Sequence, residues 1–385
     1  MRSPVIRALG LAVLVIVSAA CSPAVPTDPT GSTGPTDSSP ASLAPVDSSG
    51  LPSVGPSAEA SPSPLACGRE LRVGLVAEPG SLTDNGFNQS TADGLAAAAA
   101  AAPSCFQTDG VATKTADDAA ADIKGYADNG YDVVIGVGQE LGDALGDVAA
   151  THPGVKFIGV DSAPGPTHDA TWAVNGESLF FAEDQQGYLA GALAALLSRS
   201  HNVGVVGGLL LVPQVEGSVE GFLHGAAATV PGTTAEFAYT SSFTDPAQGG
   251  AAAKTMVAKG ADVIFSTGGA TGDGAILAAC KAGVLAIGSD TDEALSLPKG
   301  LPCLVSSAMK NVSGALTAAL LRLAGGSFTP GFHTDDAASG GVLLAPGHEL
   351  ASEITTTIQA ELDATVRGLT DGSIRTNVVI DGKTP

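Results

Sequence analysis

The chain has 385 residues, of which 17 are Lys or Arg and 39 are Asp or Glu, so its formal charge at neutral pH is −22. Such an acidic chain lacks the clustered basic residues that hold a nucleic-acid backbone, which excludes a nucleic-acid binder. Hydrophobic residues make up 44% and charged residues 15%, so the chain can bury a sizeable core. The length predicts about two domains.

The N-terminus has the pattern of a bacterial export signal. Arg2 and Arg7 precede the apolar run Ala8–Val17, and small residues lead from there to Cys21. A Cys in this place resembles a lipobox, in which the thiol receives a diacylglycerol. We therefore predict a lipoprotein signal peptide over residues 1–20 and a lipid anchor at Cys21. The alternative is an ordinary cleaved signal followed by an incidental Cys.

Residues 21–66 are rich in Pro, Ser and Thr and contain no aromatic residue. Such a composition cannot bury enough surface to fold, so we predict a disordered tether. An anchor and a tether together predict a protein on the extracytoplasmic face of the bacterial membrane.

Four cysteines follow the tether, and an exported chain can pair them. Cys67 and Cys105 each precede a predicted strand or its loop, so we favour the pairs Cys67–Cys105 and Cys280–Cys303. Each bridge would contribute about 3–4 kcal/mol of stability. Free buried thiols are the alternative. The chain has neither Cys-x-x-Cys nor His-Glu-x-x-His, so the sequence predicts no metal site and no cofactor.

From Cys67 onward, short Val- and Ile-rich runs alternate with Ala-rich stretches. The apolar runs predict strands at Leu71–Ala77, Tyr131–Gly136, Val155–Val160, Val203–Gly207, Asp262–Ser266, Val284–Gly288 and Leu304–Ser306. The Ala-rich stretches predict helices at Gln89–Ala101, Asp117–Asn129, Leu141–Ala150, Phe180–Ser198, Val215–Thr229, Ala247–Lys259, Thr271–Ala282 and Val312–Leu323. In the tail, Leu350–Val366 predicts a helix and Asn377–Ile380 an edge strand. This alternation is typical of parallel sheets covered on both faces.

The alternation is too long for one open sheet, so we predict an α/β fold of two doubly wound parallel-sheet lobes joined by a hinge. The first lobe would comprise residues 67–175 plus about 306–330, and the second residues 176–305 plus about 331–385. In such folds, ligands bind beyond the carboxyl ends of the strands.

Two aromatic residues stand in polar turns near predicted strand ends. Phe87, followed by Asn88, could stack on a flat heterocycle whose edge the amide reads. Phe87 could equally be a hydrophobic staple, with Asn88 as the N-cap of the next helix. Phe243 is the second such ring, and the two rings, one from each lobe, would form a clamp.

Charged and glycine-rich segments follow other strands. Asp161 and Asp290 could accept hydrogen bonds from sugar hydroxyls or a base N–H, or each could simply cap a helix. Lys310 could donate to ribose oxygens or be a solvated Lys. The turn Thr267–Gly274 presents backbone N–H groups that suit a neutral polar ligand, since it lacks the Lys-Ser or Lys-Thr of a phosphate loop.

Six motifs in this order resemble the basic membrane lipoprotein family, the nucleoside-binding lipoproteins of bacterial ABC importers. They extend over roughly Leu71 to Leu344 and are Asp84–Gln89, Tyr131–Gly138, Gly187–Gly191, Phe243–Pro246, Lys259–Phe265 with Gly268–Gly272, and Ile287–Asp292. The resemblance implies a periplasmic-binding-protein fold of type I, with a purine nucleoside in the cleft and ABC permease and ATPase subunits as partners. It implies no cofactor, and we expect a monomer.

The resemblance also implies roles for single residues. Phe87 and Phe243 would sandwich the base, while Asn88 and Asp161 would bond its edge. Gly269, Asp290 and Lys310 would hold the ribose, and Asp84 belongs to the same ligand-binding set. The family usually has an aromatic residue where this chain has Gln139, so ligand preference could differ here.

An enzyme would need a reactive group, and the sequence has no nucleophile elbow and no close pairing among its six His. Asp161 and Asp290 could be imagined as an acid/base pair for glycosidic cleavage. An anchored, exported chain with a stacking site is better explained as a receptor, so we predict no enzymatic activity. The remaining alternatives are a sugar-binding protein on the same fold and a ligand-sensing lipoprotein.

Overall fold

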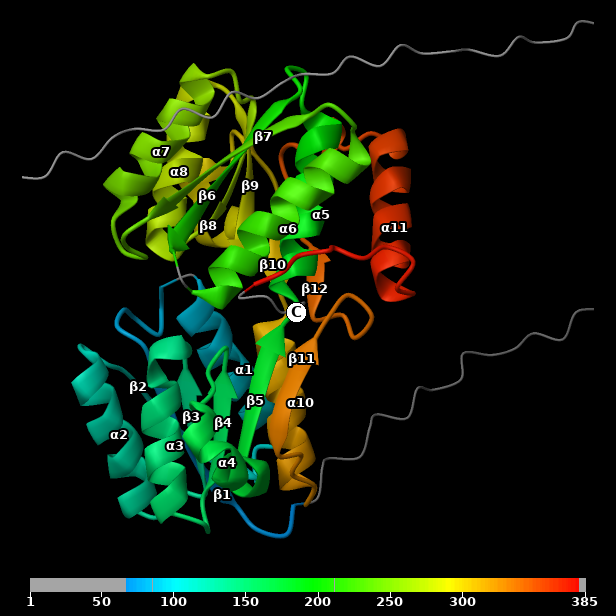
Figure 1. Cartoon of the computed structure of the whole chain (residues 1–385). Helices are drawn as coiled ribbons and strands as arrows, with labels where there is room; N and C mark the ends of the chain where they lie inside the picture. The colour runs from blue at the N-terminus through cyan, green and yellow to red at the C-terminus, as the bar shows by residue number, and fades with distance from the viewer. Residues whose placement is uncertain (1–66, 85, 211, 381–385) are drawn as a thin grey trace, which may run out of the picture. The chain divides into compact units, whose positions relative to one another are not determined.

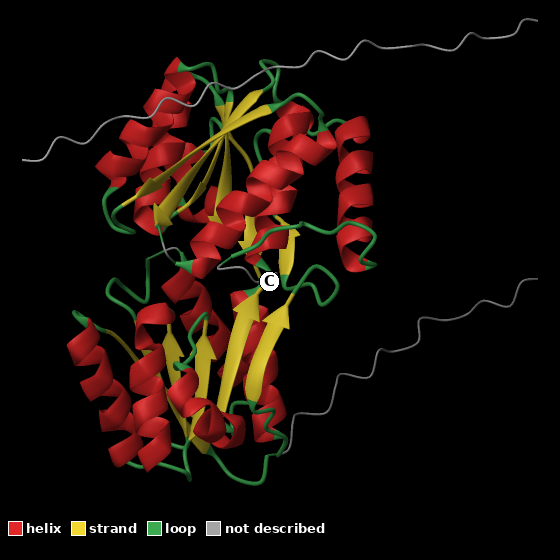
Figure 2. Ribbon diagram, viewed as in Figure 1, coloured by secondary structure: helices red, strands yellow, loops and turns green. Residues whose placement is uncertain are grey.

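The computed structural model describes residues 67–84, 86–210 and 212–380. The predicted signal peptide, the anchor at Cys21 and the tether lie outside these residues. In the described part of the chain, no helix is long and apolar enough to cross a membrane. Two six-stranded sheets with helices on both faces organise this part, which confirms the predicted α/β fold of two lobes (Figures 1 and 2).

The first sheet has the order β11-β5-β4-β3-β1-β2, and all its neighbouring strands are parallel. Its strands are β1 (Leu71–Ala77), β2 (Phe106–Ala112), β3 (Val133–Val137), β4 (Lys156–Val160), β5 (Gly176–Phe181) and β11 (Gly331–Asp335). Every residue of β3 is buried, as expected for a central strand between two helical layers.

Five α-helices surround this sheet. They are α1 (Phe87–Ala101), α2 (Ala116–Asp128), α3 (Gly142–Thr151), α4 (Asp169–Asn175) and α10 (Val312–Ala324), with short 3-10 helices at Gln139–Leu141 and Pro166–His168. The Thr115 side chain caps α2 by accepting a hydrogen bond from the Asp118 N–H. Helix α10 comes late in the chain but packs on α1, where Gly94 allows a close approach to Ser313.

The second sheet has the order β12-β10-β9-β8-β6-β7, and only β12, paired with β10, runs antiparallel. Its strands are β6 (Asn202–Leu209), β7 (Thr234–Thr240), β8 (Val263–Thr267), β9 (Leu285–Asp290), β10 (Leu304–Lys310) and β12 (Val342–Leu344). Its α-helices are α5 (Glu183–Leu197), α6 (Pro213–Thr229), α7 (Pro246–Ala258), α8 (Gly269–Ala282), α9 (Glu293–Ser296) and α11 (Thr356–Thr370), with 3-10 helices at Pro298–Gly300 and Ala351–Glu353.

Helices α5 and α6 cross very closely because glycines line their interface. A Cβ atom added at Gly187 would lie 1.9 Å from the Ser218 carbonyl oxygen, and one at Gly225 would lie 2.2 Å from that of Tyr188. Both would strike backbone, which cannot move aside. The glycines of the Gly187–Gly191 motif therefore serve the packing of the second lobe.

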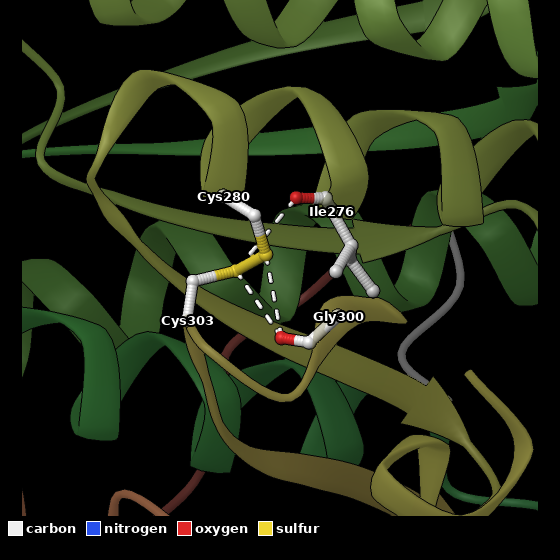
Figure 3. Close-up of a disulfide and its surroundings, with 4 residues drawn as sticks. All are labelled: Ile276, Cys280, Gly300 and Cys303. Carbon is white, nitrogen blue, oxygen red and sulfur yellow. Dashed lines mark hydrogen bonds between the residues drawn. A yellow bond between two sulfur atoms is a disulfide. The ribbon is translucent and has the colours of Figure 1, made fainter. Parts of the chain in front are cut away.

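The two disulfides join the pairs favoured from the sequence, Cys67–Cys105 and Cys280–Cys303. The first closes a loop of 38 residues and the second a loop of 23. In the second bridge, the sulfurs of Cys280 and Cys303 lie 3.3 and 3.4 Å from the Gly300 carbonyl oxygen (Figure 3). These are close sulfur–oxygen contacts, because a disulfide sulfur carries no hydrogen to donate. The bridge ties α8 to the residue before β10.

The sheets differ from the expected lobe boundaries at three places. Strand β5, interpreted partly as the start of the helix Phe180–Ser198, pairs with β4 in the first sheet. Strand β11 also joins the first sheet, whereas all of β10 belongs to the second. The physical reason is that β5 contains a Gly and the buried polar residues Glu177 and Ser178, which hide its strand character in the sequence.

The tail differs as well. The predicted helix Leu350–Val366 is displaced toward the C-terminus, since α11 covers Thr356–Thr370 with the Thr355 side chain as its cap. The predicted edge strand Asn377–Ile380 is wrong within the described residues, where only Ile380 forms an isolated bridge. The edges of the second sheet are β12 and β7.

The chain passes between the two sheets three times, after β5, after β10 and after β11. The Ala182 N–H donates to the Asp335 carbonyl (2.9 Å), and the Asn311 N–H donates to the Gly341 carbonyl (2.8 Å). These hydrogen bonds hold the crossing segments side by side. They also place the carboxyl ends of both sheets next to the crossings.

Candidate functional site

The candidate site is built around Lys310, the last residue of β10. Its ammonium nitrogen lies 2.7 Å from Asp161 Oδ2 and 3.4 Å from Asp290 Oδ1. Asp161 follows β4 of the first sheet, whereas Asp290 ends β9 of the second. The side chains of Lys310 and Asp161 are each only 7% exposed. The fold thus brings together one buried cation and a carboxylate from each sheet, three of the residues predicted from the sequence.

Both aspartates adopt the left-handed backbone conformation, with φ of 46° at Asp161 and 63° at Asp290. This conformation is strained for residues other than glycine. Neither aspartate is the N-cap of a helix, since the cap of α9 is Asp292 and no helix begins directly after Asp161. The capping alternative is therefore wrong for both, and the strained turns aim their carboxylates at Lys310.

The electrostatics of the cluster are dominated by burial and opposite charge. Burial lowers the pKa of Lys310, but Asp161, Asp290 and Glu183 together raise it above the ordinary value. Lys310 is therefore charged at any physiological pH. Burial also raises the pKa of Asp161, and Lys310 opposes that rise. The alternative of a solvated Lys310 is wrong.

Phe87 lies directly beside this charge. The Lys310 nitrogen is 4.7 Å from the centre of the Phe87 ring, a cation–π distance, and 6.0 Å from that of Phe181. Phe87 is the first residue of α1 and also packs against the core of the first lobe. The ring therefore both staples the helix to the core and borders the charged cluster.

The neighbours of Phe87 have different environments. Asn88 is 4% exposed, and its Oδ1 has no hydrogen-bond partner among the described residues. It is not an N-cap, because the capping position of α1 is Gly86. Asp84 Oδ1 accepts from the N–H groups of Gly86 (2.8 Å) and Gln89 (3.1 Å), so it fixes the turn that starts α1. In this structure Asp84 therefore stabilises the turn before α1.

Phe243 and Gly269 lie together at the carboxyl end of the second sheet. Gly269 has a φ of 56°, and the Phe243 carbonyl accepts from the Thr271 N–H (3.1 Å). The Phe243 ring lies over Gly208, where an added Cβ would come within 2.3 Å of it. Phe243 is half-buried against the core of the second lobe. These contacts of Phe243 are all with residues of the second lobe.

Sequence reasoning missed three polar residues near Lys310. Glu183 Oε1 lies 3.8 Å from the Lys310 nitrogen. Gln186 donates through its side-chain N–H to Asp290 Oδ1 (3.2 Å) and to the Ala308 carbonyl (2.8 Å). Glu78 follows β1, and burial, with help from nearby carboxylates, raises its pKa to about 7. The available signal was position, because Glu78 and Glu183 come just after strands.

Three further observations concern the surroundings of the cluster. No group of three His, Cys, Asp or Glu in the described ranges has metal-binding geometry. An open hollow of about 740 Å³ lies between α5, α6 and residues 373–377, but none of the predicted ligand residues lines it. Gln139 is exposed just beyond β3. The chemistry of the Lys310 cluster suits a donor-rich, uncharged ligand better than an anion, because acidic groups outnumber the single cation.

Comparison with known proteins identifies the family of the chain. A family model described as ABC transporter substrate-binding protein PnrA-like matches residues 71–367. The chain is 28% identical over 214 residues to a CD4+ T-cell-stimulating antigen of Listeria monocytogenes, covering 54% of this chain and 57% of that one. It is 27% identical over 214 residues to the ABC transporter nucleoside-binding protein BmpA of Lactococcus lactis, with 53% and 57% covered. The chain spans just over half the length of these curated relatives.

Solved structures agree on the fold. A solute-binding protein of an ABC transporter system from Aeropyrum pernix has a TM-score of 0.69 at 21% identity, covering 79% of this chain and 92% of that one. Another from Conexibacter woesei has a TM-score of 0.65 at 25% identity, with 79% and 98% covered. The family match extends over most of the described residues and confirms the resemblance read from the motifs. The chain therefore belongs to the PnrA-like family of ABC transporter substrate-binding proteins.

Proposed function

We propose that this protein is the extracytoplasmic solute-binding component of an ABC importer and that its ligand is a nucleoside, with purine nucleosides preferred. The observation that carries the proposal is the position of Lys310, held between a carboxylate from each sheet beside the face of Phe87. Hydroxyl groups of a sugar suit the charged side chains, and a flat base suits the ring.

We assign to the residues the roles that the family resemblance implies. Phe87 and Phe243 stack on the base, and Asn88 and Asp161 bond its edge. The unpartnered, buried Oδ1 of Asn88 is an acceptor that a base N–H would satisfy. Gly269, Asp290 and Lys310 hold the ribose. The relative from Lactococcus lactis that is named a nucleoside-binding protein supports this choice of ligand.

The proposal extends to location and partners. Cys21 carries a lipid anchor, and the tether lets the lobes reach an ABC permease, which an ATPase drives. The three crossings near Ala182, Asn311 and Gly341 act as the hinge on which the lobes close over the ligand. The protein works as a monomer and does not transform its ligand.

Calorimetric titration tests the ligand. The full chain is unfolded and refolded to remove carried ligand and is then titrated with adenosine, guanosine, inosine, uridine and ribose. We expect tight binding of a purine nucleoside and none of ribose. Binding of ribose alone, or of none of the five, contradicts the nucleoside assignment.

Two substitutions test the clamp. Phe87→Ala should lose about 1–3 kcal/mol of nucleoside binding, by analogy with base–aromatic stacking. Asp290→Ala should weaken ribose-bearing ligands much more than free bases, because it removes a partner of the sugar. Phe237→Ala is the control, since this ring is 55% exposed on β7. Equal weakening of nucleosides and free bases by Asp290→Ala would show that the ribose assignment is wrong.

A sugar-binding or ligand-sensing protein is the second candidate. The observation in its favour is that Lys310, Asp161 and Asp290 would serve a sugar without any contribution from a ring. A relative from Bacillus subtilis that is 26% identical over 202 residues is named transcriptional activator protein med. The same titration decides on the sugar, because ribose is one of its ligands.

A further inference from the structure

Glu183 occupies a special position in the fold. It is the first residue of α5, two residues after the end of β5, where the chain crosses from the first sheet to the second. Its side chain is 12% exposed, and its Oε1 lies 3.8 Å from the Lys310 nitrogen. An acidic side chain is rarely buried so far unless it is paired or protonated. The buried carboxyl group of Glu183 is therefore either paired with a cation or protonated.

Two buried oxygen atoms lack a donor. Asp161 Oδ1 and Glu183 Oε1 are inaccessible to solvent, and no described residue donates a hydrogen bond to either. Both side chains border the same ammonium group, with Asp161 Oδ2 at 2.7 Å and Glu183 Oε1 at 3.8 Å from the Lys310 nitrogen, and the Glu183 side chain helps to lower the pKa of Asp161. Two ionised carboxylates cannot form a hydrogen bond, because neither has a proton to give. One proton between them would satisfy both oxygens.

The first turn of α5 carries a second side chain that contacts the cluster, Gln186. Gln186, three residues after Glu183 and on the same face of the helix, donates to Asp290 Oδ1. Asp161 and Asp290 stand at equivalent strands of the two sheets, β4 and β9. The helix thus offers one side chain to each aspartate. Gln186 donates an amide N–H to the second lobe, and Glu183 can donate to the first only as a neutral acid.

The charge balance agrees with a neutral Glu183. One ammonium group, on Lys310, faces the carboxyl groups of Asp161, Asp290 and Glu183. Burial, followed by the neighbouring Asp161, raises the pKa of Glu183 well above its usual range, and Lys310 only partly opposes this. A third buried negative charge would be uncompensated.

Other charged residues near α5 act less strongly on Glu183. Asp184, the next residue, accepts from the Thr376 hydroxyl (2.5 Å). Glu216 and Glu220 on the neighbouring α6 act on Tyr239 of β7, whose pKa they help to raise. Helix α11 also packs on α5, and its charged residues are Glu361, Asp363 and Arg367. The strongest charges acting on Glu183 remain Asp161, Lys310 and Asp290.

We propose that Glu183 is a positioning residue of the ligand site, whose protonated carboxyl group donates a hydrogen bond to Asp161 and thereby keeps Asp161 and Lys310 aligned for the ligand. The part that concerns the ligand rests on the proposed function. Loss of this proton places a second negative charge beside Asp161 and pulls Lys310 toward Glu183. Ligand binding is therefore tight in neutral and mildly acidic solution and weakens as the pH rises.

The first test needs no ligand. Urea unfolding of the full chain is measured between pH 5 and pH 9 for the wild type, Glu183→Gln and the control Glu349→Gln, which alters an exposed acid. Because folding raises the pKa of Glu183, the folded state holds the extra proton and stability falls as the pH rises through that pKa. The amide of Glu183→Gln donates without titrating. We expect the unfolding constant of the wild type to rise, relative to Glu183→Gln, by up to about tenfold per pH unit.

The second test measures binding of the preferred purine nucleoside across the same pH range. We expect Glu183→Gln to match the wild type at pH 5 and to keep its affinity at pH 9, where the wild type weakens by about tenfold or more. Glu183→Ala, which cannot donate, should bind at least tenfold more weakly than Glu183→Gln at every pH. This rescue by the amide separates positioning from simple packing.

The outcomes separate the two proposals. A constant ratio of unfolding constants between the wild type and Glu183→Gln from pH 5 to pH 9 would overturn the proton at Glu183. Equal nucleoside affinity of Glu183→Ala and Glu183→Gln would overturn the positioning role. If the unfolding ratio changes with pH but no variant binds a nucleoside, the proton is supported and the proposed function alone fails.

Discussion

The two lobes arrange their strands in the same order but end them differently. In each sheet the third strand in the spatial order, β4 or β9, leads to an aspartate with a left-handed backbone, Asp161 or Asp290. The next strand ends in Phe181 in the first sheet and in Lys310 in the second. A shared scaffold thus presents the same acid twice but a cation only once. Lys310 at the end of β10 is therefore a difference between the lobes at the candidate site.

Removing that difference should have the largest effect. Lys310→Met leaves buried carboxylates from both lobes without their cation, so we expect a loss of about 3–5 kcal/mol in the free energy of unfolding at pH 7. The loss should shrink at pH 5, where the carboxylates can take up protons. Urea denaturation at the two pH values measures both effects.

The matched control is Lys259→Met. Lys259 pairs with Glu236 at 2.5 Å, but its side chain is 59% exposed, so the loss should stay below about 1 kcal/mol. Equal losses for the two substitutions would mean that the cluster around Lys310 has no special role in holding the lobes together.

Glycines in helices provide a second contrast between the lobes. A Cβ at Gly225 in α6 would lie 2.2 Å from the Tyr188 backbone oxygen, whereas one at Gly125 in α2 would meet nothing within 4 Å. Gly225→Ala should therefore cost about 1–3 kcal/mol through overpacking. Gly125→Ala should stabilise the protein by about 0.4–1 kcal/mol, because alanine restricts the unfolded chain. Thermal unfolding of both variants checks the signs, and destabilisation by Gly125→Ala would contradict the packing argument.

The comparison of the lobes also explains which strands the sequence could predict. Leu71–Ala77 was predicted to the residue because it is central and almost entirely buried. The strands Phe106–Ala112 and Thr234–Thr240 were missed, and both are edge strands at equivalent places in the two sheets. No residue of Thr234–Thr240 is buried, and in Phe106–Ala112 only Phe106 is, so both sequences carry polar residues and no continuous apolar run.

The same difference between buried apolar strands and more polar strands decides which site residues the sequence could predict. Asp161, Asp290 and Lys310 were found because the strands before them are buried and apolar, so their carboxyl ends could be located. Glu183 was missed because β5, with its buried Glu177 and Ser178, does not resemble a strand in the sequence. The proximity of the two sheets, which brings Lys310 onto Asp161, depends on crossings that local patterns do not encode.

The smallest expected effect concerns Asp84 of the first lobe and Asp273 of the second, two acids that repel each other. Burial, followed by Asp84 of the first lobe, raises the pKa of Asp273 in the second lobe to about 6. The folded state therefore binds this proton more tightly than the unfolded chain, and stability falls as the pH rises from about 4 to 6. Asp273→Asn should remove this fall and stabilise the protein at pH 7 by less than about 1 kcal/mol, because the group is partly exposed and screened by solvent.

Unfolding midpoints at pH 5 and pH 7 measure the change, with the exposed Asp93→Asn on α1 as the control for loss of one negative charge. If both substitutions narrow the difference between the two midpoints equally, general repulsion within a chain of charge −22 is the cause. If only Asp273→Asn does so, the repulsion is local to Asp84 and Asp273. The two lobes then repel each other at this point, whereas Lys310 attracts a carboxylate from each lobe.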